Sequence, residues 1–287
     1  MAIRAGFVGL GNIGRPMAGR LVAAGLETIV HDLREEPVRE LVAAGAAAAA
    51  SPGALASRCE YIGVCVRDDD DLRAVLRGTA GILQGASPGT VVAVHSTVQP
   101  DTVVTLAEEA AGRGVILLDA CITGGANGAV QGTLTVMVGG DAAALEKIRP
   151  ALSTFASTIV HAGPLGSGAK LKLCNNLMTY LAWTAAYEAS RLASASGLSQ
   201  EVFEAVTRSN GNLTDPMRAF LALHRAPLAT RQSRDFQALL RSFVDLAEKD
   251  LAATLALARD CGLALPGAGL ASQIMARVYG LEDEGRR

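Results

Sequence analysis

A glycine-rich run at residues 9–14 (GLGNIG) constrains the fold of this chain more than any other feature. It directly follows the apolar residues 5–8, and Pro16 then opens a segment with helical character. A strand, a glycine-rich turn and a helix in this order predict a dinucleotide-binding unit. In such a unit Gly9 permits the tight turn, Gly11 lets the backbone approach a pyrophosphate, and Gly14 lets the helix pack closely. The N–H groups and the positive dipole at the helix start would hold the anion.

One acid, Asp32, follows the second apolar run, residues 27–31, at the spacing of about twenty residues that dinucleotide-binding units use. A carboxylate there accepts hydrogen bonds from the ribose hydroxyls and repels a 2′-phosphate. The sequence therefore favours NAD over NADP. Two alternatives stay open: Arg34 pairs with a 2′-phosphate, or Asp32 is a turn residue that caps the next helix.

Length and composition indicate a globular protein with a large core. The chain has 287 residues, 50% of them hydrophobic, and a formal net charge of -2, and this length favours two domains. Without a basic cluster we expect no nucleic-acid partner. The chain shows neither a signal-peptide pattern nor an apolar span of about eighteen residues, so we expect a cytoplasmic protein with no membrane partner.

The cysteines and histidines do not have the spacing of metal ligands. The five cysteines are scattered and form no Cys-x-x-Cys pair, so we expect reduced, buried thiols. The four histidines form no His-Glu-x-x-His pattern, and we expect no catalytic metal. His95 ends an apolar run; a hydrogen-bonded strand-end histidine is favoured over a residue that lines the site.

Short apolar runs alternate with Ala- and Leu-rich stretches of helical spacing up to about residue 160. Strands separated by helices predict a parallel sheet with right-handed crossovers. The expected strands are residues 3–8, 28–31, 61–66, 91–94, 115–118, 133–138 and 158–161. Residues 46–50 are expected to be a helix end and a loop, and the acids 68–71 to cap the helix that follows.

The Gly- and Pro-containing segment 162–168 ends this alternation, and the rest of the chain has helical character. We expect an α/β fold with a Rossmann-type, mostly parallel sheet domain (1–163), followed by an all-helical substrate and oligomerisation domain (164–287). Residues 169–196 lack Pro and Gly and are apolar around most of the circumference. This pattern favours a long helix buried on several sides, between domains or between the subunits of a homodimer or homotetramer. A central core helix in a monomer would show the same pattern.

Lys172 and Asn176 lie four residues apart near the start of that helix, which places them on one face about one turn apart. Burial disfavours the charged form of a lysine and lowers its pKa, which fits Lys172 to exchange a proton. The alternative is a snorkelling side chain whose stem covers apolar surface. Lys170 points elsewhere and is expected to be solvated.

Thr123, Gly124 and Gly125 follow the expected strand 115–118, at the edge where open α/β sheets bind ligands. The backbone N–H groups of two glycines and a hydroxyl form a nest for a substrate carboxylate, unless the segment is only a Gly-rich connector.

Four blocks carry a resemblance over nearly the whole chain. They are residues 9–18 (GLGNIGRPMA), 119–134 (beginning DACITGG), 166–176 (with Lys172 and two asparagines) and 249–251 (KDL). In this order they resemble the β-hydroxyacid dehydrogenase family, which includes 3-hydroxyisobutyrate dehydrogenase and tartronate semialdehyde reductase. The sequence departs from the family at Cys121-Ile122-Thr123, where Pro-Val-Ser is usual, and at Val66-Arg67, where Leu-Pro is frequent.

The resemblance implies hydride transfer between NAD(P) and the carbinol carbon of a small 3-hydroxy acid, with Lys172 as general acid/base and Asn176 as its catalytic partner. The implied substrate-binding residues are Thr123, Gly124 and Gly125. The implied cofactor-binding residues are Gly9, Leu10, Gly11, Asn12, Ile13, Gly14, Asp32, Val66, Thr97 and Lys249. For Ser96 and Thr97 the alternative is a cap on the helix that starts near Pro100.

Other functions remain open. A 2-hydroxy-3-oxopropionate (tartronate semialdehyde) reductase would use the same residues. An imine reductase shares the architecture but generally lacks the lysine, and 6-phosphogluconate-type chemistry needs more C-terminal helix. A catalytically inactive dinucleotide-binding regulatory protein is disfavoured because it would not need Lys172 and Asn176.

Overall fold

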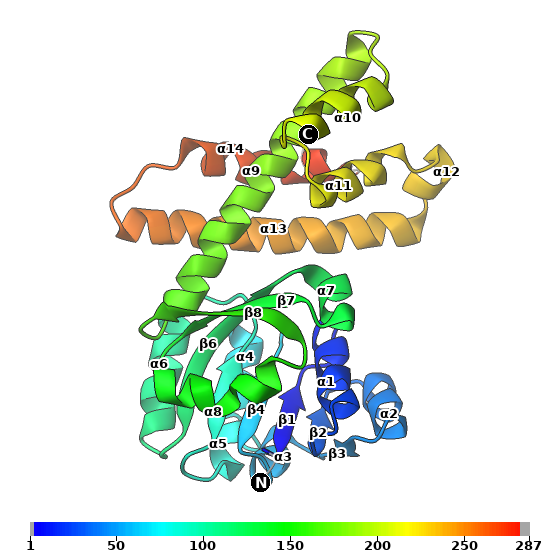
Figure 1. Ribbon diagram of the computed structural model, residues 1–287. Coiled ribbons are helices and arrows are strands. Elements are labelled where there is room, and N and C mark those ends of the chain that lie inside the picture. The colour runs from blue at the N-terminus through cyan, green and yellow to red at the C-terminus, as the bar shows by residue number, and fades with distance from the viewer. Residues whose placement is uncertain (1–2, 282–287) are drawn as a thin grey trace. The chain divides into compact units, whose positions relative to one another are not determined.

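The computed structural model describes residues 3–281 and divides into two compact units, Met1–Lys172 and Leu173–Arg287. The first unit holds the whole sheet, and the second is helical (Figure 1). The expected α/β class, with a mostly parallel sheet followed by helices, is confirmed. The expected domain boundary between residues 163 and 164 stays a prediction.

The first unit alternates strands and helices. Its strands are β1 (Ala5–Val8), β2 (Thr28–His31), β3 (Ala47–Ala48), β4 (Tyr61–Val64), β5 (Val91–Val94), β6 (Ile116–Thr123), β7 (Leu134–Gly139) and β8 (Ala156–Gly163). Its helices are α1 (Gly14–Ala23), α2 (Glu35–Ala43), α3 (Pro52–Ala56), α4 (Asp69–Arg77), α5 (Ile82–Gly85), α6 (Pro100–Ala111), α7 (Gly125–Gln131) and α8 (Ala142–Leu152).

The strands form one sheet in the order β3-β2-β1-β4-β5-β6-β7-β8. All neighbours are parallel except β6 and β7. In β5, Val91 and Ala93 face one apolar cluster, which α1, α2, α7 and α8 cover, while Val92 and Val94 face another, which α3 to α6 cover. Because helices cover both faces, the central strands are continuously apolar. Their carboxyl ends form the edge at which open α/β sheets generally bind ligands.

Two details of the expected secondary structure need correction, and a third is confirmed. The alanine run contains the short strand β3, where a helix end and a loop were expected. The strand expected at residues 115–118 continues to Thr123, because its second half pairs with β7. The expected cap of α4 is confirmed, since the Asp68 carboxylate accepts a hydrogen bond from the N–H of Asp71 (2.9 Å).

Helices build the second unit. They are α9 (Ser167–Ala195), which begins in the first unit, α10 (Gln200–Ser209), α11 (Asp215–Arg225), α12 (Leu228–Arg231), α13 (Arg234–Asp260) and α14 (Pro266–Tyr279). An aromatic cluster forms the centre of the core: Trp183 stacks on Phe220 with 5.1 Å between ring centroids, and Tyr279 packs edge-on against both.

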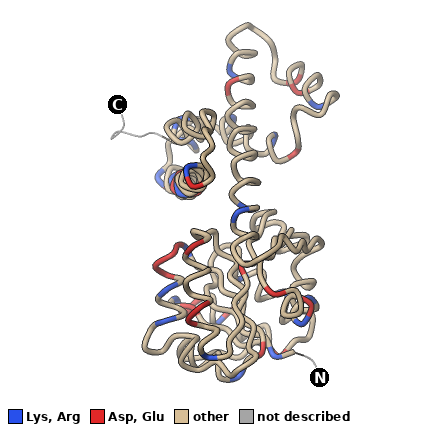
Figure 2. The backbone as a smooth tube through the Cα atoms, turned by 90° about the vertical axis from the view of Figure 1, so that its left-hand side faces the viewer, with Lys and Arg blue, Asp and Glu red and all other residues tan. Residues whose placement is uncertain are grey.

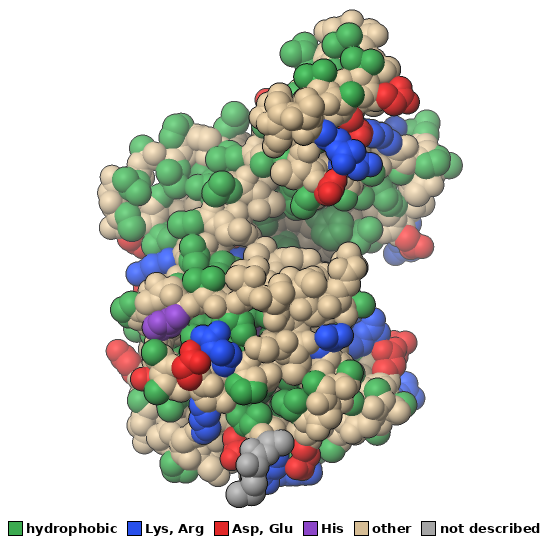
Figure 3. Space-filling model, viewed as in Figure 1, with side chains coloured by type: hydrophobic (Ala, Val, Ile, Leu, Met, Phe, Trp, Pro, Cys, Tyr) green, Lys and Arg blue, Asp and Glu red, His purple; other side chains and the backbone are tan. Residues whose placement is uncertain are grey.

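In the single chain α9 is partly exposed, so the alternative of a core helix in a monomer is wrong, while burial between subunits stays a prediction. Leu173 and Tyr180 are buried, but Met178 and Leu192 are 75% and 69% exposed. Figure 3 shows apolar side chains on the surface of the helical unit. Acidic and basic residues are interspersed within each unit (Figure 2), in agreement with the near-neutral net charge. The expected homodimer or homotetramer stays a prediction.

Candidate active site

In the turn after β1, two of the three glycines have no room for a side chain, whereas the third has free space beside it. Gly9 has a φ of 90°, and a Cβ there would lie 2.2 Å from the carbonyl oxygen of Cys65. A Cβ on Gly14 would lie 2.0 Å from the carbonyl oxygen of Gly9, so α1 begins in direct contact with the turn. A Cβ on Gly11 would meet nothing within 4 Å. The turn can therefore take a phosphate at Gly11, where its backbone is accessible.

Asp32 is tied to this turn. One carboxylate oxygen accepts a hydrogen bond from the N–H of Leu10 (2.6 Å), and the other accepts from the N–H (2.8 Å) and the Nε (3.2 Å) of Arg34. Arg34 also donates to the carbonyl oxygen of Leu10 (2.9 Å). Partial burial opposes ionisation, but these hydrogen bonds prevail and hold the pKa of Asp32 below its ordinary value. The carboxylate therefore carries its charge beside the glycine-rich turn at neutral pH.

Ser96 follows β5 and is hydrogen-bonded to a residue just after β4 and to a residue of β6. Its hydroxyl accepts a hydrogen bond from the N–H of Val66 (2.8 Å), and its carbonyl oxygen accepts one from the thiol of Cys121 (3.4 Å). The alternative that Ser96 or Thr97 caps α6 is wrong, because the N-cap residue of α6 is Gln99. Val66 and Thr97 thus follow adjacent parallel strands at the carboxyl edge of the sheet.

Thr123 is the last residue of β6, and Gly124 and Gly125 lead directly into α7. The two glycines have φ values of 121° and 66°, which only glycine adopts readily. A Cβ on Gly125 would meet nothing within 4 Å. Thr123 thus directly precedes, along the chain, the backbone N–H groups at the start of α7, which is the order of groups that the expected carboxylate nest needs.

The start of α9 is anchored to the sheet by Asp119, a fully buried residue of β6. Its carboxylate accepts hydrogen bonds from the N–H groups of Gly166 (2.8 Å) and Ala169 (2.7 Å). Burial raises the pKa of the Asp119 carboxyl, and the N–H groups oppose that rise. Lys172 follows one turn later and is half-buried, whereas Lys170 is exposed, as expected.

Asn176 is buried and belongs to the second unit. Its Nδ2 donates to the Asp250 carboxylate (2.6 Å), which also accepts from the hydroxyl of Tyr180 (2.9 Å) and forms an ion pair with Lys249 (3.1 Å). Because a carboxylate only accepts hydrogen bonds, the Asn176 amide must turn its nitrogen to Asp250 and its oxygen away. That oxygen accepts a hydrogen bond from Nδ2 of Asn175 (3.3 Å) and keeps capacity for a second.

Some of the sequence-predicted residues are bonded to one another within each unit. In the first unit, the glycine-rich turn and Asp32 are directly bonded to each other, and Val66 is linked to the end of β5. In the second unit, Asn176 and Lys249 meet at the Asp250 carboxylate. Tyr180 was not singled out from the sequence, although it stands four residues after Asn176. Asp250 was part of the block 249–251 but was given no role of its own.

His95 has the structural role that was favoured for it. It is buried, its ring nitrogens bond to the hydroxyl of Tyr61 (3.1 Å) and the carbonyl oxygen of Ala120 (2.7 Å), and burial lowers its pKa to about 4. The expectation of buried thiols is wrong for Cys174 and Cys261, which are exposed. Their helix faces turn outward, which the scattered spacing could not reveal.

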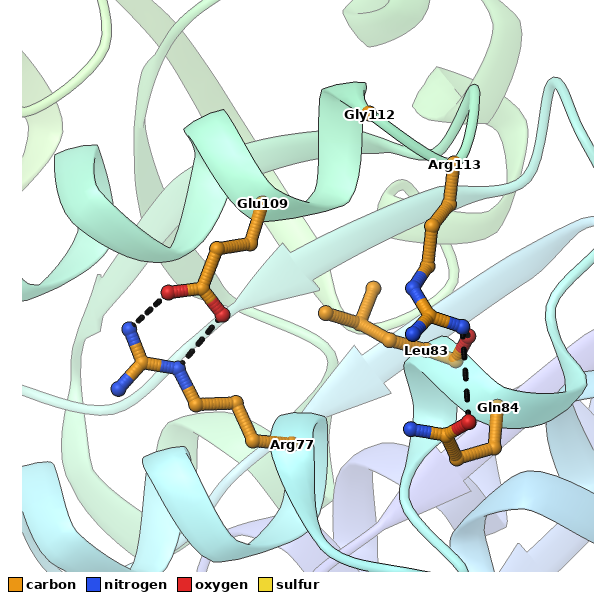
Figure 4. A pocket seen from close by; sticks show the side chains of 6 residues that line it. All are labelled: Arg77, Leu83, Gln84, Glu109, Gly112 and Arg113. Atoms are coloured by element: carbon orange, nitrogen blue, oxygen red, sulfur yellow. Dashed lines mark hydrogen bonds and ion pairs between the residues drawn. The ribbon is translucent and has the colours of Figure 1, made fainter.

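A surface pocket of about 440 Å³ in the first unit is lined by other residues, which are Arg77, Leu83, Gln84, Glu109, Gly112 and Arg113 (Figure 4). Its charged groups are already paired: Arg77 with Glu109, and Arg113 with the carbonyl oxygen of Leu83 (2.8 Å). Among residues 3–281, no group of three or more His, Cys, Asp or Glu side chains could hold a metal ion. Within the same residues, the helices lack the combination of length and apolarity needed to cross a membrane.

Comparison with known proteins agrees with a dinucleotide-binding oxidoreductase. A family model described as the NAD binding domain of 6-phosphogluconate dehydrogenase matches residues 4–163. A second, described as NAD-binding of NADP-dependent 3-hydroxyisobutyrate dehydrogenase, matches residues 166–286. These two matches define the class of the protein as an oxidoreductase with NAD(P)-binding domains.

Individual relatives narrow this class. The 3-hydroxyisobutyrate dehydrogenase of Pseudomonas aeruginosa is 33% identical over 274 residues, which are 93% of this chain and 89% of that protein. The NAD-dependent L-serine dehydrogenase of the same species is 39% identical over 206 residues, 71% of this chain and 69% of that protein. A crystal structure of 3-hydroxyisobutyrate dehydrogenase from Salmonella typhimurium, 28% identical, superposes with a TM-score of 0.83 and covers 96% of this chain and 93% of that chain. The chain belongs to the β-hydroxyacid dehydrogenase family.

Proposed function

We propose that this protein is an NAD-dependent dehydrogenase of small 3-hydroxy acids of the 3-hydroxyisobutyrate class, with Lys172 as general acid/base. One observation carries the proposal: Asn176, an amide that a buried carboxylate holds in one orientation, lies one helical turn after the half-buried Lys172. Such an amide keeps its oxygen as an acceptor, which can hold an ammonium group in place, and a purely structural helix face does not need this.

The glycine-rich turn and Asp32 are the residues that would hold the cofactor. Their geometry fits a dinucleotide, because the turn is open at Gly11 and Asp32 presents a charged carboxylate beside it. When bound, NAD supplies the hydride acceptor of the reaction. Val66, Thr97 and Lys249 are the further cofactor contacts in this proposal.

Lys172 exchanges the proton of the reacting hydroxyl. In oxidation its neutral amine takes the proton as the carbinol carbon loses its hydride, and in reduction its ammonium returns the proton to the developing alkoxide. The oxygen of Asn176 accepts a hydrogen bond from the lysine and keeps the amine directed at the substrate oxygen. The backbone N–H groups at Gly124 and Gly125, with the hydroxyl of Thr123, bind the substrate carboxylate and so orient the carbinol carbon.

A substrate panel tests this function. The purified protein is incubated with NAD or NADP and 3-hydroxyisobutyrate, 3-hydroxypropionate, glycerate or L-serine, while the absorbance of the reduced nicotinamide is followed; 2-hydroxy-3-oxopropionate is added with the reduced cofactor. The 3-hydroxy acids are expected to reduce NAD. Binding of NAD without turnover of any member would favour the regulatory protein instead.

Asp32 is expected to set the cofactor preference. In Asp32→Asn, the repulsion of a 2′-phosphate is lost and Arg34 is released to pair with it, so the ratio of kcat/KM for NAD to that for NADP should fall by about tenfold or more. The matched control is Glu35→Gln, which removes an exposed acidic charge three residues away and should leave the ratio unchanged. A ratio that is the same in both variants would show that Asp32 does not select the cofactor.

A further inference from the structure

We propose that Asp119 is a positioning residue of this enzyme: its carboxylate fixes the first turn of α9 and thereby the place of Lys172. The inference rests on the proposed function, since it assigns a role relative to Lys172. Asp119 and Lys172 both belong to the first compact unit. Asp119 lies at the point where β6 changes partners, opposite Val94 of the parallel neighbour β5 and Gly139 of the antiparallel neighbour β7.

Each of the two carboxylate oxygens of Asp119 accepts a hydrogen bond from a different backbone N–H group. One accepts from the N–H of Gly166, just before α9, and the other from the N–H of Ala169, in its first turn. A negative charge at this position also complements the positive end of the helix dipole. Because both oxygens are used in this way and the side chain is fully buried, Asp119 holds the helix and does not itself exchange protons with a substrate.

Glycines allow this close approach and leave little freedom for the helix start. A Cβ on Gly168 would lie 2.4 Å from the carbonyl oxygen of Met137 in β7, and a Cβ on Gly139 would lie 2.4 Å from a carboxylate oxygen of Asp119. The first turn of α9 therefore rests directly on the backbone of β6 and β7. Its position cannot shift without breaking the bonds to Asp119.

Lys172 follows Ala169 by three residues and so lies on the neighbouring turn of the same helix. The place of its amine depends on where the helix begins, and a misplacement of about 1 Å in an active site can cost about a hundredfold in rate. A buried acid in the middle of a sheet is unfavourable unless it is hydrogen-bonded. Asparagine, which has one acceptor oxygen, could not satisfy both N–H groups.

The test compares Asp119→Asn with Asp141→Asn, using NAD and the best substrate of the panel. Asp141 is the matched control because its carboxylate also accepts a backbone N–H, that of Ala144 (2.6 Å), at the start of α8. In Asp119→Asn, kcat should fall by about tenfold or more, while the KM for substrate and the Kd for NAD stay within about twofold. Asp141→Asn should keep the kcat of the unmodified enzyme. If Asp119 only stabilised the fold, Asp119→Asn would lower the melting temperature but would not lower kcat at a constant KM.

A second variant keeps the carboxylate and displaces the helix start. Gly168→Ala introduces the contact with the carbonyl oxygen of Met137 and should also lower kcat at constant Kd for NAD. If Asp119→Asn does not fold, the kcat of Gly168→Ala tests the inference in its place. In the unmodified enzyme, the amides of Gly166 and Ala169 should exchange hydrogen slowly, and rapid exchange would overturn the inference.

The inference and the proposed function fail in different ways. If Lys172→Ala keeps its activity, the proposed function fails. If Lys172→Ala is inactive but folded Asp119→Asn keeps a kcat within about twofold of the unmodified enzyme, the function stands and the role of Asp119 is refuted.

Discussion

Replacement of Lys172 by alanine is expected to lower kcat by about a hundredfold to ten-thousandfold, the range that general acid–base groups contribute. The loss should fall on the chemical step, because the residues proposed to bind the dinucleotide lie on other elements. The Kd for NAD, measured by titration of the protein's intrinsic fluorescence, should therefore remain within about twofold. Lys172→Arg should not restore the rate, because a guanidinium does not give up its proton near neutral pH.

Lys170→Ala is the matched control for this prediction. Lys170 lies two residues earlier in the same helix, has the same side chain and is exposed. The control should keep the kcat of the unmodified enzyme. If Lys172→Ala stays within about threefold of that rate, another group exchanges the proton and the acid/base role fails.

Replacement of Gly11 by alanine is expected to weaken NAD binding by about tenfold or more without loss of stability, because the added methyl projects into the space proposed for the pyrophosphate. Inside the protein that methyl meets no atom within 4 Å. The free energy of unfolding should therefore change by only about 0.5 kcal/mol, as for surface substitutions. Isothermal calorimetry with NAD and urea denaturation measure the two quantities separately.

Two other glycines serve as controls. Gly269 lies inside α14, where a Cβ likewise meets nothing within 4 Å, so Gly269→Ala should leave NAD binding unchanged and add up to about 1 kcal/mol of stability. Gly14→Ala should destabilise the fold by about 1–3 kcal/mol, because its Cβ would collide with the carbonyl oxygen of Gly9. Unchanged NAD affinity in Gly11→Ala would contradict the proposed phosphate site.

Local sequence patterns were sufficient to predict most of the strands of the fold. The strands expected at residues 28–31 and 91–94 are β2 and β5 without change, and the apolar run of β5 is typical of a strand that helices cover on both faces. The extension of β6 to Thr123 could not be seen locally, since it depends on pairing with β7. The strand β3 consists of alanines, which carry no strand signal of their own.

In the candidate site too, the sequence predicted the local motif but not the contacts between residues far apart in the chain. The glycine-rich turn and Asp32 form a local motif about twenty residues long, so their joint geometry could be anticipated. Asp250 meets Asn176 from 74 residues away, and Asp119 meets Ala169 across 50 residues. Such partners are decided by tertiary packing, and the sequence placed Asp119 and Asp250 only in blocks of the family resemblance, without their partners.

A crystal structure of the protein with NAD and a 3-hydroxy acid from the panel tests the central claim most directly. If Lys172 is the general acid/base, its amine should lie at hydrogen-bond distance, about 2.6–3.2 Å, from the reacting hydroxyl oxygen, with the oxygen of Asn176 as its second partner. A complex in which the Lys172 amine lies in solvent while another side chain holds the hydroxyl would contradict it.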